Sequence, residues 1–436
     1  MKLGLPIMIG QLGVIILSFA DTMMVGRYGT DELAAAGFVN NMFNLVIVFS
    51  TGFSYGLTPL VGGLYGRGEH AGAGRMLRNA LAVNGGVAGI LMVIMGVLYF
   101  NLHLLGQPVE LLPLIRPYYL VLLVSLVFVL LFNAFKQFSD GVTDTLTPMF
   151  ILLGGNILNI FGNWLLIYGN WGFPEMGLLG AGAATLASRV VMLLVFIAVF
   201  LSARRYSPYR TGFKESCVNR SDSRSLMRMG MPVGLQMGME TASFSLTAVM
   251  VGWIGTTALA AHQVMLTVGQ LGFMMYYGMA AAVAVLASNY HGRSDFESVR
   301  RTVSSGFRII LVMALTVCVP LLLFRNQIGN LFTEDAKVVE MVGMLVIPFV
   351  IYQFGDGLQC NYSNALRGIS DVSKVSMYAF IAYFLVSLPS AYIFAFVLDL
   401  GLIGIWCSFP LGLTTAGLLF YRRYRRTLSG TPSVLQ

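Results

Sequence analysis

Apolar segments long enough to cross a membrane follow one another along the whole 436-residue chain. A run of about 18 or more apolar residues with few charges is typical of a transmembrane helix. We predict twelve spans, at about residues 4–26, 36–62, 79–103, 114–136, 147–168, 177–203, 230–253, 259–290, 303–324, 341–365, 375–398 and 401–421. Only 11% of the residues are charged, against about 25% in soluble domains, so a soluble fold is excluded. The predicted fold class is an all-α integral membrane protein.

The lysines and arginines predict how these spans are oriented. If both termini and the loops after even-numbered spans share one side, that side holds 22 of the 27 basic residues. The other side holds Arg27, Arg116, Arg325 and Lys337, and Arg189 falls within span six. Because cytoplasmic loops carry the excess of Lys and Arg, both termini are predicted to be cytoplasmic. The net charge of +8 then reflects topology and requires no nucleic-acid partner.

The chain also repeats itself at a nearly constant offset. The segments LPIMIG, MVGRYGTDELAA and YGRGEHAGAGR resemble MPVGLQ, MVGWIGTTALAA and HGRSDFESVRR, each 226 residues later. GVTDT and GLLGA have counterparts at offsets of 227 and 224. We therefore predict two six-helix bundles of the same orientation around a central cleft, as in transporters built from parallel repeats. The predicted parts are an N-lobe at 1–203, a cytoplasmic linker at 204–229 and a C-lobe at 230–436.

Three carboxylates stand well inside the predicted spans, namely Asp21, Glu240 and Asp356. A charge there costs about 2.5–3.5 kcal/mol on insertion scales and by default marks a functional site. The repeat places Thr247 opposite Asp21 and Val14 opposite Glu240, so each half has acids of its own. A membrane scaffold with a relic duplication would have no use for these acids. They instead predict sites that bind cations.

Polar residues one helical turn away are candidate partners of the acids in the second half. Tyr352 precedes Asp356 by four residues and therefore shares its helix face. Gln236 stands in the same relation to Glu240 and is also a candidate polar residue of the cavity. We expect the Tyr352 hydroxyl to donate a hydrogen bond to the Asp356 carboxylate.

Span five carries Asn159 and Asn163, again four residues apart, and span six carries Thr185. With a carboxylate, their oxygens could coordinate a hard monovalent cation or hold a protonated acid. The competing interpretation of the Asn pair is interhelical hydrogen bonding without function. His262 and Gln263 open span eight and are further candidate polar residues of the cavity, although a lone histidine is more often a packed interface residue.

The remaining charged residues near the spans, and the cysteines, are predicted to have structural roles. Arg189 is expected to pair with a buried acid or with carbonyls at a helix end. Asp140 and Asp144 are expected to be solvated in a cytoplasmic loop. The four cysteines form no CxxC pair, so neither a disulfide framework nor a metal site is predicted. The first apolar run is too long for a cleavable signal peptide.

Several motifs together resemble one family. FADTMMVGRYGTDELAAAG, LNIFGNW, METASF, AAHQV and YQFGD with LRGISD are similar to segments of the multidrug and toxic compound extrusion (MATE) transporters, most closely the NorM-like branch. The resemblance covers essentially the whole chain, although relatives carry a short cytoplasmic helix before the first span. It implies that Asp21, Asn159, Asn163 and, more weakly, Thr185 form the N-lobe site, and that the C-lobe cation site is formed by Glu240, Tyr352 and Asp356.

The resemblance implies a monomeric antiporter of a bacterial cytoplasmic (inner) membrane. It would export cationic amphipathic drugs or dyes by alternating access, driven by inward flow of Na+ or H+, without a cofactor. Na+ would bind at Glu240, Tyr352 and Asp356 or at Asp21, Asn159 and Asn163. The alternative is a flippase for lipid precursors, whose cavity should carry Arg and Lys; the three acids against Arg189 alone favour cationic cargo. An enzyme is not predicted, because no Ser-His-Asp arrangement, HExxH motif or phosphate loop is present.

Overall fold

The computed structural model describes residues 2–105, 109–333 and 335–429, and no strand occurs in these ranges. Eleven helices of the described chain are long and apolar enough to cross a membrane. The helix that holds the predicted span 230–253 is not among the eleven, because polar residues such as Gln236 and Glu240 lower its apolar content. The prediction of an all-α, multi-pass membrane protein is confirmed.

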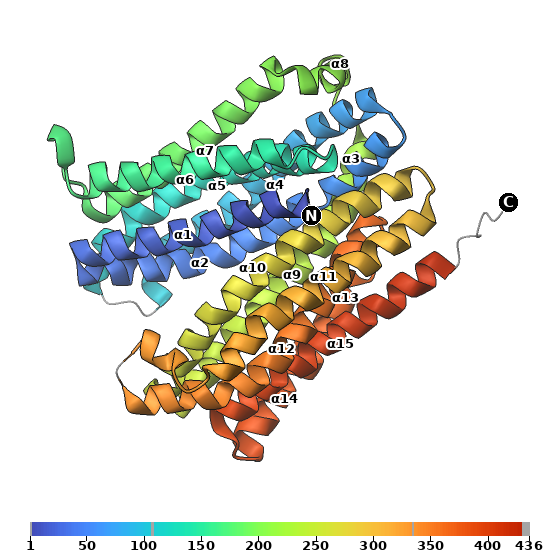
Figure 1. The fold of residues 1–436 in the computed structure, drawn as a ribbon. Coiled ribbons are helices and arrows are strands. Elements are labelled where there is room, and N and C mark those ends of the chain that lie inside the picture. The colour runs from blue at the N-terminus through green and yellow to red at the C-terminus, as the bar shows by residue number, and fades with distance from the viewer. Residues whose placement is uncertain (1, 106–108, 334, 430–436) are drawn as a thin grey trace. The chain divides into compact units, whose positions relative to one another are not determined.

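The helices follow one another in the predicted order (Figure 1). The first half forms α1 (Gly4–Tyr28), α2 (Thr30–Ser54), α3 (Leu57–Gly66), α4 (His70–Phe100), α5 (Leu112–Gly141), α6 (Leu146–Ile167), α7 (Gly177–Ser202) and α8 (Ser207–Glu215). The second half forms α9 (Arg220–Ile254), α10 (Thr256–Gly292), α11 (Phe296–Leu323), α12 (Ala336–Gly368), α13 (Val375–Phe380), α14 (Leu388–Tyr392) and α15 (Gly401–Ser429). Two π-helical segments, Ile381–Ser387 and Ile393–Val397, flank α14, so the predicted span 375–398 is not a regular α-helix.

The chain separates into two compact units. The N-terminal unit is Ile9–Gly234, and the C-terminal unit combines the residues up to Met8 with those from Leu235 onward. The divisions after Met8 in α1 and after Gly234 in α9 lie 226 residues apart, which is the offset of the sequence repeat. The boundaries expected from sequence, at 203 and 230, stay a prediction.

Backbone geometry shows that the repeat is structural. Three pairs of residues with positive φ lie at the repeat offsets. They are Gly68 (φ 77°) with Ser294 (φ 59°), Thr143 (φ 67°) with Ser370 (φ 59°), and Gly177 (φ 53°) with Gly401 (φ 53°). Left-handed backbone is uncommon for residues other than glycine, so its recurrence at Thr143 and Ser370 and at Ser294 shows that both halves form the same turns between matching helices. The predicted internal duplication is confirmed.

Aromatic side chains hold α5 against α7 in the N-terminal unit. The rings of Phe135 and Phe196 stack with centroids 5.5 Å apart, and Phe132 meets Phe196 edge to face at 5.7 Å. Closer to the other end of α5, Tyr119 meets Phe43 of α2 at 4.9 Å. Such pairs contribute about 0.5–1.5 kcal/mol beyond the burial of their area. The packing of α5 on α7 positions the polar residues that both helices carry.

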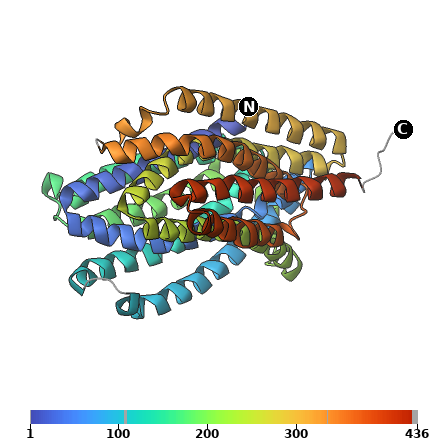
Figure 2. The same ribbon diagram turned by 90° about the horizontal axis from the view of Figure 1, so that it is seen from below.

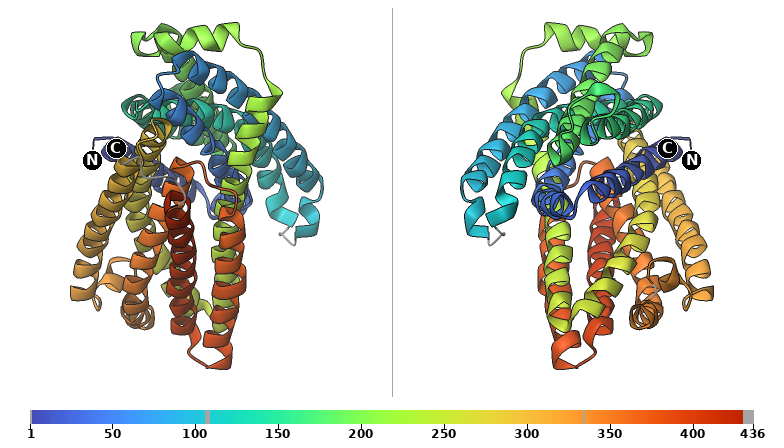
Figure 3. Two further views of the ribbon diagram at one scale, coloured as in Figure 1. Left: turned by 90° about the vertical axis from the view of Figure 1, so that its right-hand side faces the viewer. Right: turned by 90° about the vertical axis from the view of Figure 1, so that its left-hand side faces the viewer.

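The segment predicted to be a linker is folded against the N-terminal unit. A Cβ at Gly212 of α8 would lie 1.8 Å from the Ala71 carbonyl oxygen, so α8 packs on α4 backbone to backbone. Arg78 donates hydrogen bonds to the carbonyls of Phe213 and Lys214 at the end of α8, at 3.1 and 3.0 Å. Figure 3 shows α8 lying across one end of the helices of this unit.

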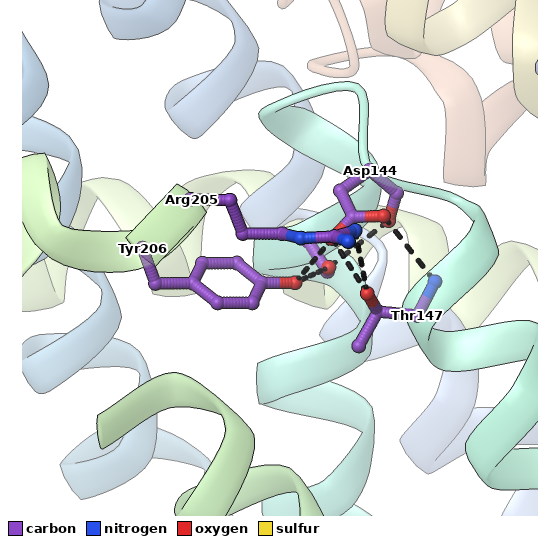
Figure 4. A network of polar contacts seen from close by, with 5 residues as sticks. Asp144, Thr147, Arg205 and Tyr206 are labelled. Carbon is purple, nitrogen blue, oxygen red and sulfur yellow. Dashed lines mark hydrogen bonds and ion pairs between the residues drawn. The ribbon is translucent and has the colours of Figure 1, made fainter. Parts of the chain in front are cut away.

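Asp144, in the turn between α5 and α6, fastens the chain that follows α7 (Figure 4). Its Oδ2 accepts hydrogen bonds from Thr147 Oγ1 at 2.7 Å, Tyr206 Oη at 2.8 Å and Arg205 Nη1 at 3.0 Å. Burial alone would raise the pKa of Asp144, but these donors outweigh burial and hold the pKa below its usual value. The charged form is therefore the one that stabilises this corner.

The prediction that Asp140 is solvated is wrong. Asp140 lies in the last turn of α5, is 4% exposed, and pairs with Lys136 at 3.0 Å. Its i, i+4 spacing from Lys136 and the cover of neighbouring helices take both charges out of water together. Asp144 is also mostly buried, with 13% of its side chain exposed.

The C-terminal unit has the matching corner. Asp371, 227 residues after Asp144, accepts two hydrogen bonds from Arg423 at 2.7 and 2.9 Å and one from Thr427 at 2.6 Å. These donors again hold the pKa of Asp371 below its usual value against the effect of burial. In the N-terminal unit the turn after α5 therefore binds the residues that follow α7, and in the C-terminal unit the turn after α12 binds the end of α15. α12 and α15, which run alongside each other, are held at this corner (Figure 2).

We expect Asp144→Asn to lower the melting temperature of the detergent-solubilised protein at pH 7 by about 3–12 °C. Hydrogen bonds to a charged group contribute about 1.5–3 kcal/mol, and each kcal/mol corresponds to about 2–4 °C in a domain of this size. The pKa of Asp144 is lowered by folding, so its contribution is present above the unfolded pKa of about 3.9 and is lost as the pH falls through the folded pKa. Scanning fluorimetry from pH 7 to pH 3 should show the difference narrowing below about pH 4.

The matched control is Glu297→Gln. Glu297 pairs with Arg301, but both side chains are more than 70% exposed, and such pairs contribute about 0–1 kcal/mol. A change in melting temperature as small for Asp144→Asn as for Glu297→Gln would refute the structural role of Asp144.

Candidate functional site

Helices α1, α6 and α7 bring the predicted residues of the first half together. Asn163 Nδ2 donates to Asp21 Oδ1 at 2.5 Å and also lies 3.1 Å from Asn159 Oδ1. Asn159 Nδ2 in turn lies 3.2 Å from Thr185 Oγ1 and 3.3 Å from Ser188 Oγ. We call Asp21, Asn159, Asn163, Thr185 and Ser188 the N-site.

Close packing of α6 on α7 makes this network possible. Gly162 sits next to Asn163, and a Cβ there would lie 3.0 Å from Ala184 Cβ. Small residues let transmembrane helices approach closely enough for side chains to hydrogen-bond across them. Asn159 and Asn163 are 1% and 0% exposed, whereas Asp21 and Thr185 are partly exposed. The Asp21 carboxylate therefore lies at the partly exposed edge of the hydrogen-bond network, and the two asparagines lie in its buried part.

A guanidinium lies close to the N-site. Arg189 of α7 attracts the Asp21 carboxylate electrostatically and hydrogen-bonds Ser125 Oγ of α5. Arg189 forms no salt bridge with an acid within the described residues, so the expected pairing with a buried acid stays a prediction. One negative and one positive charge then stand together among neutral amides and hydroxyls.

The N-site contains a buried oxygen that accepts no hydrogen bond from the described residues. Asn163 Oδ1 is buried and has no hydrogen-bond partner in the part of the chain that the structure describes. A buried polar atom without a partner costs about 1–3 kcal/mol, so it is rare unless something else binds there. Amide and carboxylate oxygens are ligands for hard cations. These residues fit a monovalent cation or a proton shared with Asp21.

Helices α9 and α12 bring Glu240 and Gln359 together in the C-terminal unit. Gln359 Nε2 donates to Glu240 Oε2 at 3.1 Å and is also 3.1 Å from the hydroxyl of Tyr383. The Tyr383 hydroxyl itself lies within hydrogen-bonding reach of Glu240, and Arg367 attracts this carboxylate electrostatically. We call Glu240, Asp356, Gln359, Arg367 and Tyr383 the C-site.

Asp356 is the most enclosed acid of the C-site. It is 1% exposed, and the Cys360 thiol lies 3.7 Å from its Oδ1. Its Oδ2 has no partner within the described chain, and neither has the buried hydroxyl of Tyr276. Glu240 and Asp356 also repel each other electrostatically. An arriving cation would relieve that repulsion and meet oxygens that have no other partner.

The other predicted residues of the second half are placed differently. Tyr352 is buried, but no hydrogen bond to Asp356 is formed among the described residues; its ring instead meets Trp406 at 6.2 Å. Gln236 is buried, and its Oε1 has no partner in those same ranges. The roles of Tyr352 and Gln236 in binding a cation remain predictions.

His262 is packed among aromatic rings. It is fully buried, 5.6 Å from Trp406 and 6.4 Å from Phe409 between ring centroids. This geometry is that of a packed interface residue, which was the competing interpretation. Its neighbour Gln263 is exposed. Any role of either residue in the cavity stays a prediction.

Sequence reasoning did not include Ser188, Gln359, Arg367 or Tyr383. Gln359 lies three residues after Asp356, a spacing that places both on one helix face and could have been noticed. Tyr383 belongs to the π-helical segment Ile381–Ser387, where α-helical spacing assigns faces incorrectly. Such segments are frequent at functional sites.

Dedicated metal centres have a different composition from these sites. No three His, Cys, Asp or Glu side chains converge anywhere in the described ranges. The N-site combines one carboxylate with neutral amides and hydroxyls, and the C-site combines two carboxylates with an amide, a hydroxyl and the guanidinium of Arg367.

Known proteins resemble the chain over nearly its whole length. A model of the MatE family matches residues 6–165 and 232–393, two stretches that begin 226 residues apart. The chain is 32% identical over 433 residues to a probable multidrug resistance protein NorM from Bradyrhizobium diazoefficiens, covering 97% of this chain and 92% of that protein. A protein of the same name from Xanthomonas axonopodis pv. citri is 29% identical over 425 residues, covering 98% and 93%.

Solved structures agree on the fold. A multidrug resistance MATE family transporter of the MOP superfamily, in an outward-facing conformation, has a TM-score of 0.88 at 22% identity. The match covers 98% of this chain and 95% of that one. It confirms the predicted fold class of twelve helices in two bundles. The chain belongs to the MatE family of multidrug and toxic compound extrusion transporters, and it is a transporter rather than an enzyme.

Proposed function

We propose that this transporter exports cationic amphipathic compounds in exchange for Na+ or H+, with the N-site and the C-site as its cation-binding sites. The names of its NorM relatives support multidrug efflux as the activity. A monomer in a bacterial cytoplasmic membrane, with both termini in the cytoplasm, is part of this proposal. Domain boundaries at 203 and 230 remain part of it as well.

The observation that carries the proposal is the charge balance of the C-site. Two carboxylates, Glu240 and Asp356, repel each other electrostatically, and one guanidinium, that of Arg367, attracts Glu240. When both acids are ionised, the C-site has a net charge of about −1, and uncompensated charge in a low-dielectric interior is strongly unfavourable. One Na+, one H+ or one cationic drug would neutralise it. Because each occupant removes the charge that attracts the others, ion and drug exclude one another.

The N-site differs from the C-site in its net charge. Asp21 already has Arg189 nearby, so an added Na+ would leave the N-site with a surplus of positive charge. A proton on Asp21 would change the hydrogen bond of 2.5 Å between Asp21 and Asn163. A drug cation that binds Asp21 in place of the attraction from Arg189 would change the same hydrogen bond. We infer that the C-site binds the coupling ion and that the N-site responds to protonation or to the drug.

Transport in reconstituted vesicles tests the proposed function. Proteoliposomes containing ethidium should be studied with a Na+ gradient and with a pH gradient, one at a time. Dye movement should follow at least one inward cation gradient and stop when an ionophore dissipates it. Movement that is equally fast with and without a gradient would show a passive pore and would contradict antiport.

The orientation can be measured with Cys217, which is exposed between α8 and α9. We expect a membrane-impermeant maleimide to label Cys217 only after cells are opened, because the basic segment around it is predicted to be cytoplasmic. Cys407, which is also exposed, should first be replaced by serine. Labelling of Cys217 in intact cells to the same extent as in opened cells would reverse the orientation.

A further inference from the structure

A groove of about 800 Å³ lies in the C-terminal unit, away from the residues of the C-site. Its walls are α12, α15 and the segment that joins α11 to α12. None of Glu240, Asp356, Gln359, Arg367 and Tyr383 lines it. The groove therefore needs an explanation other than the coupling site.

One wall of the groove is an apolar stripe on α12. Met344, Ile347 and Ile351 are spaced three and four residues apart. Their exposed fractions are 44, 52 and 55%, respectively. Leu345 and Phe349, on the opposite face of the helix, are fully buried. The stripe from Gly343 to Ile351 is about 12 Å long at 1.5 Å per residue. That length is close to one leaflet of a hydrocarbon core about 30 Å thick.

The other end of the groove is polar and contains both signs of charge. Arg325 and Asn326 come from the joining segment, and Glu340 comes from α12. The joining segment lies against α12 at Gly343, where a Cβ would be in ordinary van der Waals contact with the Arg325 carbonyl oxygen at 3.4 Å and with Asn326 Oδ1 at 3.5 Å. Within the described residues, neither Arg325 nor Glu340 forms a salt bridge with the other or with any other side chain. One cation and one anion are thus available at the end of an apolar stripe.

We propose that the groove binds one phospholipid with a primary amine in its headgroup. Arg325 and Asn326 donate to the phosphate, Glu340 accepts from the ammonium, and an acyl chain lies along Met344, Ile347 and Ile351. A guanidinium is suited to phosphate because it offers several donors in a fixed geometry. A primary ammonium offers three donors to Glu340, whereas a quaternary amine offers none. An anionic headgroup without an amine would place negative charge beside Glu340.

The leaflet follows from the proposed orientation. Arg325 lies on the side that carries few basic residues, so the lipid belongs to the outer leaflet. Only the assignment of the lipid to the outer leaflet rests on the proposed function. The binding of the lipid does not, because it can be measured without transport.

Native mass spectrometry of the purified protein with one lipid at a time tests the site. Phosphatidylethanolamine should be retained as a single bound molecule, about tenfold more tightly than phosphatidylglycerol or phosphatidylcholine, since hydrogen bonds to charged groups are worth about one to two factors of ten. Arg325→Gln should lower retention of all three lipids. Glu340→Gln should remove only the preference for phosphatidylethanolamine.

The matched control is Lys337→Ala, a charge on the same helix that does not line the groove. Retention should be unchanged in this variant. A second measurement uses Cys407, which lines the groove: a bulky apolar maleimide on it should displace the bound lipid. Equal retention in the wild type, Arg325→Gln and Glu340→Gln would overturn the proposal, and so would a preference for phosphatidylglycerol. Both results can occur with transport intact, so they leave the proposed function untouched.

Discussion

Replacing Glu240 by glutamine is expected to reduce ion-driven dye efflux at least about tenfold while leaving the fold intact. The substitution removes one charge and almost no volume, and Gln359 can still hydrogen-bond the new amide. The loss of a charge-assisted contact with the ion costs about 1.5–3 kcal/mol, and each 1.4 kcal/mol is a factor of ten. The C-site would then be close to neutral without an ion, so it would have little reason to bind one. Initial rates in proteoliposomes, at matched protein amounts, measure the effect.

Two further variants separate charge from shape. Glu240→Asp keeps the charge and should retain more activity than Glu240→Gln. Gln359→Ala should add little to Glu240→Gln, because residues of one network are not additive. Glu297→Gln, the same substitution at an exposed position, should transport at the wild-type rate. If Glu240→Gln transports as fast as Glu297→Gln under both gradients, the C-site is not where the ion binds.

Replacing Asp21 by asparagine should also impair efflux at least about tenfold and flatten its dependence on external pH. Asp21 is the only carboxylate of the N-site, and its bond to Asn163 joins α1 to α6. Asn163→Ala and Asn159→Ala should give weaker defects of the same kind. A double-mutant cycle between Asp21→Asn and Asn163→Ala should be non-additive, since one hydrogen bond links the two side chains.

Asp31→Asn is the control for this series, because Asp31 is an exposed residue in the first turn of α2. It should leave the rate and its pH dependence unchanged. Normal transport by Asp21→Asn would mean that Asp21 is an ordinary residue in contact with water and that coupling depends on the C-site alone.

The sequence predicted the helices and the acids because both depend on composition over short stretches. Long apolar runs give spans, and a constant offset gives the duplication, which Gly177 and Gly401 display with the same φ of 53°. The spacing of four placed Asn159 and Asn163 on one helix face, where they hydrogen-bond, whereas only the resemblance to MATE transporters grouped them with Asp21.

Contacts between distant segments were harder to predict. The bond between Asp140 and Lys136 is local, but their burial depends on how other helices cover α5, and this is not visible in a window of sequence. Tyr383 reaches Glu240 from a π-helical segment whose spacing no α-helical pattern describes. Tyr352, placed by spacing alone, instead packs its ring near Trp406.

The coupling ion and the drug are proposed to compete for the buried carboxylates, and equilibrium binding tests this competition most directly. Binding of radiolabelled tetraphenylphosphonium to the purified protein should be measured while Na+ is raised at constant pH, and again while pH is lowered without Na+. In the wild type, we expect the apparent affinity to fall at least about tenfold in one of these titrations. In the triple variant Asp21→Asn, Glu240→Gln and Asp356→Asn, the affinity for tetraphenylphosphonium should be weak. It should also be independent of the Na+ concentration and of the pH. Binding by the wild type that changes with neither Na+ nor pH, or a triple variant that keeps the wild-type dependence, would contradict the account.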